Sequence, residues 1–186
     1  MTPKAKIKVS KFLCLLLRHT PEAVNAQGWA STTEVLVALK AKFAGITPSV
    51  LNEIVVEDDK QRYSFSLHGE LIRANQGHSI PVDLGLVAVA PPEYLFHGTA
   101  RKTLWLIRRD GLLPMDRQYV HLSSSLDTAR LVGKRHGDPI VLTVLAEKMS
   151  EKHTFYRSEN GVWLTIAVPI EFLHFEEDDA ERADHL

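Results

Sequence analysis

The chain has 186 residues and a formal net charge of −1, and its composition is 45% hydrophobic and 24% charged. These values are those of an ordinary globular protein and exclude a largely disordered chain. No run of 18 apolar residues is present, which excludes a membrane-spanning helix. Cys14 is the only cysteine, so neither an internal disulfide nor a cysteine-based zinc site is expected. The basic N-terminus lacks the apolar run of a secretory signal, and we expect a cytoplasmic protein.

The net charge is an average over two unlike segments. Residues 171–186 contain seven acidic residues and one basic residue, a formal charge of −6, which leaves +5 for residues 1–170. A basic body is compatible with a phosphate-rich ligand. The acidic tail, residues 176–186, is equally explained by solubility, and we expect it to be disordered.

The first half of the chain predicts three helices. Apolar residues recur at helical spacing over residues 9–17, and Thr20-Pro21 ends that helix because the residue before proline avoids the helical region. A capping box over residues 31–34 begins a second helix. Thr47-Pro48 places a cap residue before a proline and begins a third.

A β-hairpin is predicted after these helices. Residues 63–67 alternate as a strand does, His68-Gly69 forms a turn, and residues 70–75 return as a second strand. Three helices followed by a hairpin are typical of a winged-helix lobe, which we place at residues 1–90. The paired prolines Pro91-Pro92 indicate a linker.

The second half predicts a different, α+β lobe at residues 91–175. Short strands are expected at residues 94–97, 119–122, 140–145 and 162–168, and helices at residues 104–109 and 126–136. Short strands mixed with two helices are the pattern of an α+β lobe.

Three basic clusters are candidate phosphate-binding residues. Arg18-His19 ends the first predicted helix, Arg73 begins a polar run over residues 73–79, and Arg135 lies in a cationic cluster between two glycines. Arginine binds phosphate through two parallel hydrogen bonds. Taken singly, each cluster is more typical of a helix C-terminus or of a solvated loop than of a phosphate site.

Two short polar segments follow predicted strands in the second half. The first is His97-Gly98-Thr99 and the second is His121-Leu122-Ser123. Imidazoles and hydroxyls offer hydrogen bonds to a ligand, and glycine lets a ligand approach the backbone. The nine histidines form no zinc-protease pair, so no metal site is expected. The chain also lacks a P-loop, a Rossmann fingerprint and a nucleophile elbow.

Together and in this order, these segments resemble the NAD-dependent RNA (tRNA) 2′-phosphotransferase family over residues 7–175. The segments that carry the resemblance are Lys8-Val9-Ser10-Lys11-Phe12-Leu13, Leu17-Arg18-His19, Gly28-Trp29, Ile72-Arg73-Ala74-Asn75-Gln76-Gly77-His78-Ser79, Leu95-Phe96-His97-Gly98-Thr99, Val120-His121-Leu122-Ser123, Val132-Gly133-Lys134-Arg135-His136-Gly137 and Gly161-Val162-Trp163-Leu164-Thr165. The resemblance implies an N-terminal winged-helix lobe that binds RNA and a C-terminal ADP-ribosyltransferase-like lobe that binds NAD⁺.

The resemblance also implies a reaction and its residues. An RNA 2′-phosphate attacks the NAD⁺ ribose and expels nicotinamide, and the ADP-ribosylated RNA then yields a 2′-OH RNA and ADP-ribose 1″,2″-cyclic phosphate. The essential residues of the family fall on Arg18, His19, Arg73 and Arg135. Its NAD signature falls on His97, His121 and Val162, and Gly98, Thr99, Leu122 and Ser123 flank that signature. NAD⁺ is consumed, no metal is required, and we expect a monomer.

We expect Arg73 and Arg135 to clamp the phosphate, and Arg18 and His19 to hold it from the RNA side, with all four converging from the two lobes. Positioning and charge stabilisation account for most of the rate in such chemistry. Two alternatives remain open. One is mono-ADP-ribosylation of protein or of nucleic-acid phosphate ends, for which Glu159 is the discriminating residue. The other is a winged-helix regulator that senses NAD⁺.

Overall fold

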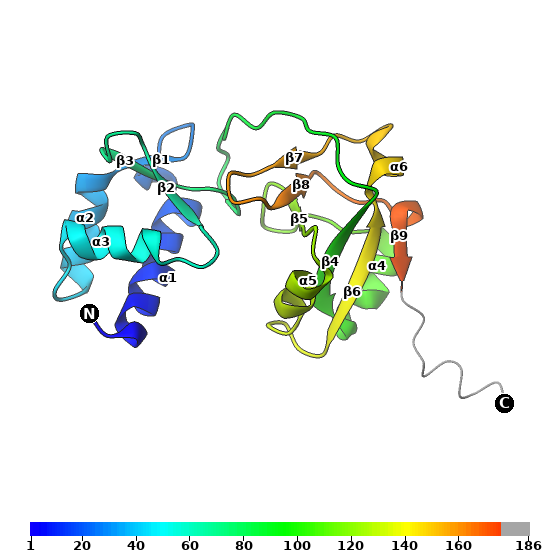
Figure 1. The fold of residues 1–186 in the computed structure, drawn as a ribbon, viewed down its shortest axis with the longest axis horizontal. Helices are drawn as coiled ribbons and strands as arrows, with labels where there is room; N and C mark the ends of the chain where they lie inside the picture. The colour runs from blue at the N-terminus through cyan, green and yellow to red at the C-terminus, as the bar shows by residue number, and fades with distance from the viewer. Residues whose placement is uncertain (176–186) are drawn as a thin grey trace. The chain divides into compact units, whose positions relative to one another are not determined.

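The computed structural model describes residues 1–175, which form a mixed α+β protein with three small antiparallel sheets (Figure 1). The α+β class predicted from the sequence is thereby confirmed. The chain divides into two compact units. The first unit contains Met1–Leu86 together with two short segments, Asp116–Gln118 and Ser158–Asn160, and the second contains the rest of the described chain. The predicted acidic tail, residues 176–186, lies outside the described residues.

Three helices form the helical part of the first unit. They are α1 (Pro3–His19), α2 (Thr32–Lys42) and α3 (Pro48–Val56), and a one-turn 3₁₀ helix, η1 (Pro21–Ala23), follows α1. The hydroxyls of Thr2, Ser31 and Thr47 cap the three α-helices by accepting a backbone N–H of the first turn. All three helices predicted from periodicity and capping are confirmed.

A three-stranded sheet completes the first unit. The strands are β1 (Trp29–Ser31), β2 (Tyr63–Phe65) and β3 (Leu71–Ala74), in the order β1-β3-β2, and both pairs are antiparallel. The predicted hairpin is confirmed as β2 and β3. Strand β1 was not predicted, because three residues are too few to show alternation. Apolar side chains from the helices and the sheet share one core, in which Val9, Leu13, Leu17, Leu39 and Ile72 are fully buried.

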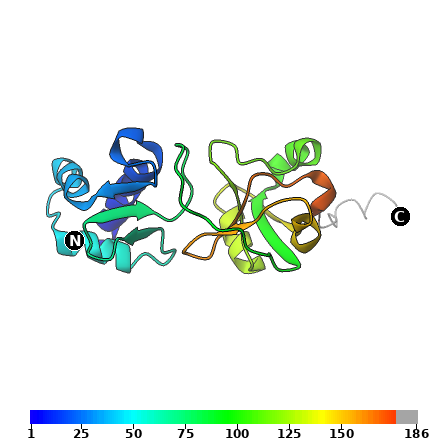
Figure 2. The same ribbon diagram turned by 90° about the horizontal axis from the view of Figure 1, so that it is seen from above.

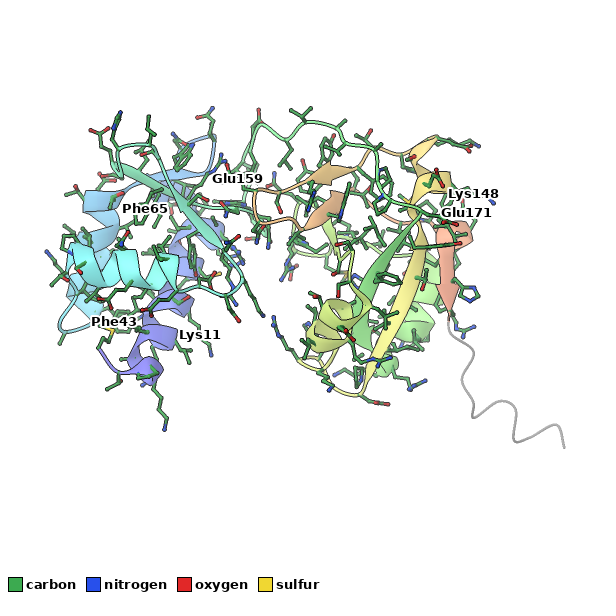
Figure 3. All side chains as sticks on the ribbon, in the orientation of Figure 1. Lys11, Phe43, Phe65, Lys148, Glu159 and Glu171 are labelled. Carbon is green, nitrogen blue, oxygen red and sulfur yellow. The ribbon has the colours of Figure 1, made fainter. Side chains whose placement is uncertain are left out.

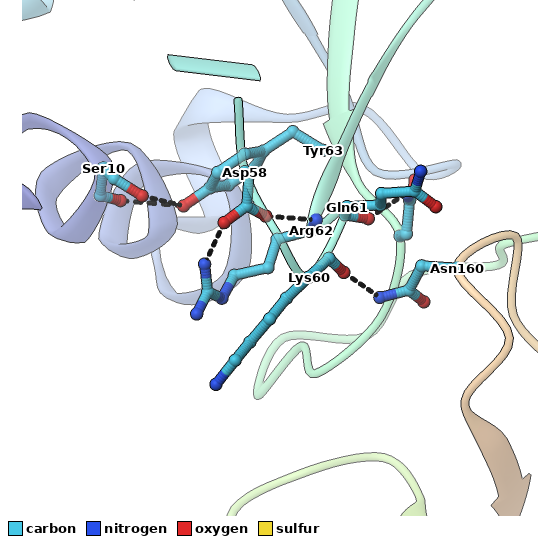
Figure 4. A network of polar contacts seen from close by, with 8 residues as sticks. Ser10, Asp58, Lys60, Gln61, Arg62, Tyr63 and Asn160 are labelled. Carbon is cyan, nitrogen blue, oxygen red and sulfur yellow. Dashed lines mark hydrogen bonds and ion pairs between the residues drawn. The ribbon is translucent and has the colours of Figure 1, made fainter. Parts of the chain in front are cut away.

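A polar network holds the Ser158–Asn160 segment to the first unit (Figure 4). The side-chain amide of Asn160 donates to the carbonyl of Lys60 at 2.9 Å. On the same loop, Asp58 pairs with Arg62, and at the start of β2 the Tyr63 hydroxyl donates to the Ser10 carbonyl at 2.8 Å. The start of β2 is therefore tied to α1, and the loop before it is tied to a residue 100 positions later in the chain.

The second unit contains two three-stranded sheets. One has the order β4 (Tyr94–Ala100), β6 (Pro139–Leu145), β9 (Leu173–Phe175), and the other has the order β5 (Val120–Leu122), β8 (Trp163–Thr165), β7 (Tyr156–Arg157). Its helices are α4 (Leu104–Asp110), α5 (Leu126–Gly133) and α6 (Ala146–Ser150), with short 3₁₀ turns η2 (Arg101–Thr103) and η3 (Ile170–Phe172). Figure 2 shows the same elements from a second direction. The core includes the fully buried Leu95, Leu142 and Met149. Strands β7 and β9 and helix α6, two to five residues long, were not predicted.

Helix α5 packs so closely on β4 that two backbones meet. A side chain on Gly98 would overlap the carbonyl oxygen of Ala129, and a Cβ on Gly133 would lie 2.8 Å from the carbonyl oxygen of Thr99. The helix predicted over residues 126–136 is therefore too long by three residues. After Gly133 the chain continues in turns, in which Arg135 donates to the carbonyl of Val132.

Within the described residues, no helix is long and apolar enough to cross a membrane.

Candidate active site

Arg18 is a buried cation at the C-terminal end of α1. Its residue is only 9% exposed, and within residues 1–175 its Nε and Nη2 atoms have no hydrogen-bond partner. A buried guanidinium that lacks acceptors carries a large desolvation penalty. The backbone of Gly77, at φ +88°, passes so close that an added Cβ would lie 3.2 Å from Arg18 Nη1. Arg18 is therefore held in a close-fitting site with donors still to be satisfied.

His78 lies beside this guanidinium and is almost completely buried. It is 1% exposed, and within residues 1–175 neither ring nitrogen has a hydrogen-bond partner. Burial, followed by the positive charges of Arg18, His19 and Arg73, lowers the pKa of His78 to about 4. The imidazole is therefore neutral at physiological pH. The first unit thus gathers the guanidiniums of Arg18 and Arg73 and the imidazole of His19 around one neutral histidine.

His19 is the exposed member of this group. Its Nδ1 shares a hydrogen bond with the Ser79 hydroxyl at 2.8 Å, and the Ser79 amide donates to the carbonyl of Arg18 at 3.0 Å. Partial burial lowers the pKa of His19, and the positive charges of Arg18 and Arg117 act in the same direction. The 73–79 run thus fixes both residues at the end of α1, which explains why this polar run follows β3 directly.

Arg73, on β3, is held by an aromatic ring and a carboxylate. Its guanidinium carbon lies 4.5 Å from the centroid of the Trp29 ring, a cation–π geometry. It also forms an ion pair with Glu159, which is labelled in Figure 3, and Glu159 accepts a second hydrogen bond from the Ser64 hydroxyl at 2.9 Å. Among the residues that the structure describes, none accepts a hydrogen bond from Arg73 Nε. No local sequence pattern predicted the ion pair with Glu159, because Glu159 is 86 residues away in the chain.

The structure therefore brings three of the four predicted phosphate-site residues into the first unit. Arg18, His19 and Arg73 all act on His78, which places them within short electrostatic range of one another. Like charges gathered in this way disfavour one another unless an anion neutralises them. The fourth residue, Arg135, belongs to the second unit, so its joining the other three stays a prediction.

Arg135 is exposed and lies in the turn that follows α5. Within residues 1–175, no ion pair engages its guanidinium. Its neighbour in space is the backbone of the α5 C-terminus, where a positive charge is favoured by the helix dipole. An exposed cation with no carboxylate partner suits contact with a phosphate, and equally suits a helix end.

The two predicted histidines of the second unit are brought together by pairing between β4 and β5. Phe96 and Ser123 exchange backbone hydrogen bonds of 2.8 and 2.9 Å, and His97 Nδ1 lies 3.1 Å from the carbonyl oxygen of His121. In this hydrogen bond Nδ1 carries the proton and donates it, since a carbonyl oxygen only accepts. The ring of His97 is thus oriented by the residue with which it was predicted to act.

Val162 is joined to this region through β8. Residue Trp163, which follows Val162 and begins β8, pairs with Leu122 on β5. Three strands therefore bring all three residues of the predicted NAD signature into one part of the second unit. Their roles in binding NAD⁺ stay predictions.

The four residues that flank the predicted NAD signature make structural contacts. Gly98 has its side-chain space taken by the backbone of α5, and Leu122 is buried in the core. Ser123 Oγ donates to the carbonyl of Ser125 and accepts from its amide, which shapes the N-terminus of α5. Thr99 Oγ1 shares a hydrogen bond with Thr103 at 2.9 Å. The packing of α5 is thus sufficient to account for Gly98, and contact of these four residues with a ligand stays a prediction.

The donor set of the second unit suits the hydroxyl and diphosphate oxygens of a nucleotide. Imidazoles and hydroxyls are present, whereas no group of three or more histidine, cysteine or acidic residues that could hold a metal occurs within residues 1–175.

Comparisons with known proteins agree over nearly the whole chain. Residues 4–167 match the family described as RNA 2′-phosphotransferase, Tpt1/KptA family. A probable RNA 2′-phosphotransferase of Acaryochloris marina is 50% identical over 169 residues, which cover 88% of this chain and 93% of that protein. Proteins with the same description from Herpetosiphon aurantiacus and Agrobacterium fabrum are 45% and 46% identical, covering 95% and 94% of this chain and 100% and 97% of their own lengths.

Proposed function

Because this chain belongs to the RNA 2′-phosphotransferase family, Tpt1/KptA, which transfers an RNA 2′-phosphate to NAD⁺, we propose that its first unit binds the phosphorylated RNA and its second unit binds NAD⁺. The buried guanidinium of Arg18 carries this proposal. Two of its nitrogens lack acceptors in a site only 9% exposed, and a phosphate supplies the oxygens that they need.

The first unit is a winged-helix lobe in this proposal, and the second is an ADP-ribosyltransferase-like lobe. Three helices combined with the sheet β1-β3-β2 support the first assignment. Two three-stranded antiparallel sheets, with His97 and His121 on adjoining strands, support the second. We propose that one copy of the chain is sufficient for the reaction.

Arg18 and Arg73 hold the 2′-phosphate in the first unit. Arg18 donates from its unpartnered Nε and Nη2, and Arg73 donates from a guanidinium kept in place by the Trp29 ring. Neutral His78 fills the space beside them without adding charge, since its pKa is about 4. Because these donors are already fixed in place, they need little reorganisation when charge develops on the phosphate during the reaction.

His97, His121 and Val162 hold NAD⁺, whose ribose supplies the electrophilic carbon from which nicotinamide leaves. The contact between His97 and the carbonyl of His121 orients the imidazole for that task. The attacking phosphate is already an anion, so no carboxylate is required to activate it. The apolar side chain of Val162 is consistent with the absence of a need for a carboxylate. The task of these residues is to position the two reactants.

Arg135 stabilises negative charge on the phosphate in the second step, when the neighbouring ribose hydroxyl attacks phosphorus. Its exposure and lack of an ion pair within the described residues support this role. His19, whose pKa is lowered by partial burial and whose ring is oriented by Ser79, can accept a proton at that step.

The alternative role of Glu159 as a catalytic acid is not favoured by its contacts. Its carboxylate is engaged by Arg73 and by Ser64, both on strands of the first unit.

Incubation with NAD⁺ and an RNA oligonucleotide that carries one internal 2′-phosphate tests the proposal. The expected products are the 2′-OH oligonucleotide, nicotinamide and ADP-ribose 1″,2″-cyclic phosphate, and the variant Arg18→Gln is expected to lose at least tenfold in rate. A matched 2′-OH oligonucleotide is the control. Full turnover by a folded Arg18→Gln variant would contradict the assignment of Arg18.

A further inference from the structure

The segment Asp116–Gln118 belongs to the first unit, although the residues on both sides of it belong to the second. Two hydrogen bonds of Gln118 attach it. The Gln118 amide donates to the carbonyl of His78 at 3.1 Å, and its side-chain amide donates to the carbonyl of Val82 at 3.0 Å. The segment is therefore attached through His78 to the 73–79 run, which contacts Arg18 and His19, and through Val82 to the residues that follow that run.

Arg117, in the middle of this segment, adds a further cation to the same group. Its residue is exposed, and its positive charge contributes to lowering the pKa of His19. Desolvation of the guanidinium, followed by the charge of Arg18, in turn lowers the pKa of Arg117 below the usual range for arginine. These electrostatic effects place Arg117 within short electrostatic range of Arg18 and His19, the two residues that end α1.

The resulting arrangement has a buried and an accessible side. Arg18 and His78 are buried, and within residues 1–175 two nitrogens of each side chain have no hydrogen-bond partner, whereas Arg117 and His19 reach solvent. Three arginines, Arg18, Arg73 and Arg117, belong to this group, and the carboxylate of Glu159 pairs with Arg73. Positive charge around the unsatisfied nitrogens of Arg18 and His78 favours a ligand that carries two negative charges over one that carries a single charge.

We propose that Arg117 is a further phosphate-binding residue of the first unit, which contacts the RNA 2′-phosphate from the solvent side and selects a monoester dianion over the singly charged diesters of the RNA backbone. This inference rests on the proposed function. A 2′-phosphate is a monoester that carries a charge of about −1.5 to −2 at pH 7, whereas each backbone diester carries one charge. A third guanidinium therefore contributes more to binding the 2′-phosphate monoester than to binding the diesters of the surrounding RNA backbone.

The test measures equilibrium binding of two RNA oligonucleotides of one sequence, with and without an internal 2′-phosphate, in the absence of NAD⁺. The variant Arg117→Gln is expected to weaken binding of the 2′-phosphorylated oligonucleotide by about 10-fold or more, and binding of the 2′-OH oligonucleotide by less than about threefold. Arg117→Lys is expected to restore part of the loss, because it keeps the charge and loses the planar fork. Arg109→Gln is the matched control, since Arg109 is an exposed arginine of the second unit that pairs with Asp110.

Two failures of this test are distinguishable. If the unaltered protein does not prefer the phosphorylated oligonucleotide, the proposed phosphate site fails. If it does prefer that oligonucleotide and Arg117→Gln retains the full preference, or weakens both oligonucleotides equally, the role of Arg117 fails. Titration of His19 by NMR gives a readout that is independent of RNA, since loss of the Arg117 charge is expected to raise the pKa of His19. An unchanged His19 titration in a folded Arg117→Gln variant would contradict the placement of Arg117.

Discussion

The guanidinium of Arg73 is shared between the carboxylate of Glu159 and the face of the Trp29 ring. The carboxylate holds Arg73 where a phosphate is proposed to bind, and it competes with that phosphate for the same donors. The side chain of Glu159 is 54% exposed, so water readily replaces Arg73 as its partner. We therefore expect Glu159 to act as an exchangeable counter-ion of the proposed phosphate site.

Replacement of Glu159 by glutamine tests this competition. Glu159→Gln is expected to tighten binding of a 2′-phosphorylated oligonucleotide by about two- to fivefold, because an exposed ion pair contributes at most about 1 kcal/mol. Turnover is expected to continue. Glu171, an exposed acidic residue of the second unit labelled in Figure 3, provides the matched control Glu171→Gln.

A catalytic role of Glu159 in modifying protein predicts a different result. Labelled NAD⁺ supplied without a 2′-phosphate would then mark a macromolecule, and Glu159→Gln would abolish that labelling. Loss of RNA 2′-phosphate transfer in Glu159→Gln would contradict the counter-ion role.

Removal of the Arg135 guanidinium is expected to separate the two chemical steps. Arg135→Ala should slow the second step by roughly 10²-fold or more, because the loss of one preorganised donor to a developing charge has an effect of that size. ADP-ribosylated RNA is then expected to accumulate, and gel electrophoresis with labelled RNA measures it. The exposed Lys148 on α6 (Figure 3) offers the control Lys148→Ala. Normal turnover without an accumulating intermediate would exclude Arg135 from the second step.

The buried His78 predicts a pH dependence of stability. Its pKa is about 4 in the folded protein and near 6.5 in the unfolded chain, so the unfolded chain binds the proton first as the pH falls. The free energy of unfolding contributed by this group is fully present above pH 6.5 and declines as the pH falls toward 4. Urea unfolding at pH 7, 6, 5 and 4 measures the decline.

The variant His78→Gln isolates that contribution, since glutamine does not titrate. The decline in unfolding free energy between pH 6.5 and pH 4 is expected to be smaller in the variant than in the unaltered protein. An equal decline in both proteins would show that His78 is not the group responsible.

Gly98 predicts a stability effect that is independent of any ligand. Gly98→Ala places a methyl group against the carbonyl of Ala129, and the destabilisation in the absence of NAD⁺ is expected at or above the upper end of the roughly 1–3 kcal/mol that overpacking costs. Gly45→Ala is the matched control, because a Cβ there meets nothing within 4 Å and only the positive φ of +75° is strained. Equal unfolding midpoints for the two variants would contradict the close packing of α5 on β4.

The sequence was most informative where the pattern was local. Helices α1, α2 and α3 followed from apolar periodicity and from capping hydroxyls, all of which involve residues within four positions of one another. Strand β1 and helix α6 were missed, because elements of three to five residues contain too few positions to define a period. Helix α5 was predicted too long, because its end is set by the contact of Gly133 with Thr99, which lies 34 residues earlier.

The candidate site shows the same division. Arg18, His19 and Arg73 were recognised by motif and by resemblance, yet nothing local indicated that Arg18 is buried and lacks acceptors. Glu159 and Arg117 were not placed in the phosphate site, because each reaches it from a segment surrounded in sequence by the second unit. Such contacts depend on how distant segments fold together, and no periodicity or composition encodes them.

The most direct test of the phosphate site is the binding of RNA by the unaltered protein and by Arg18→Gln, without NAD⁺, so that chemistry does not intervene. We predict that the unaltered protein binds an oligonucleotide with one internal 2′-phosphate at least about 10-fold more tightly than the matched 2′-OH oligonucleotide. Arg18→Gln, shown to be folded by its thermal unfolding, is predicted to bind both oligonucleotides equally. An undiminished preference for the phosphorylated oligonucleotide in that variant would contradict the assignment of the phosphate to the buried guanidinium of Arg18.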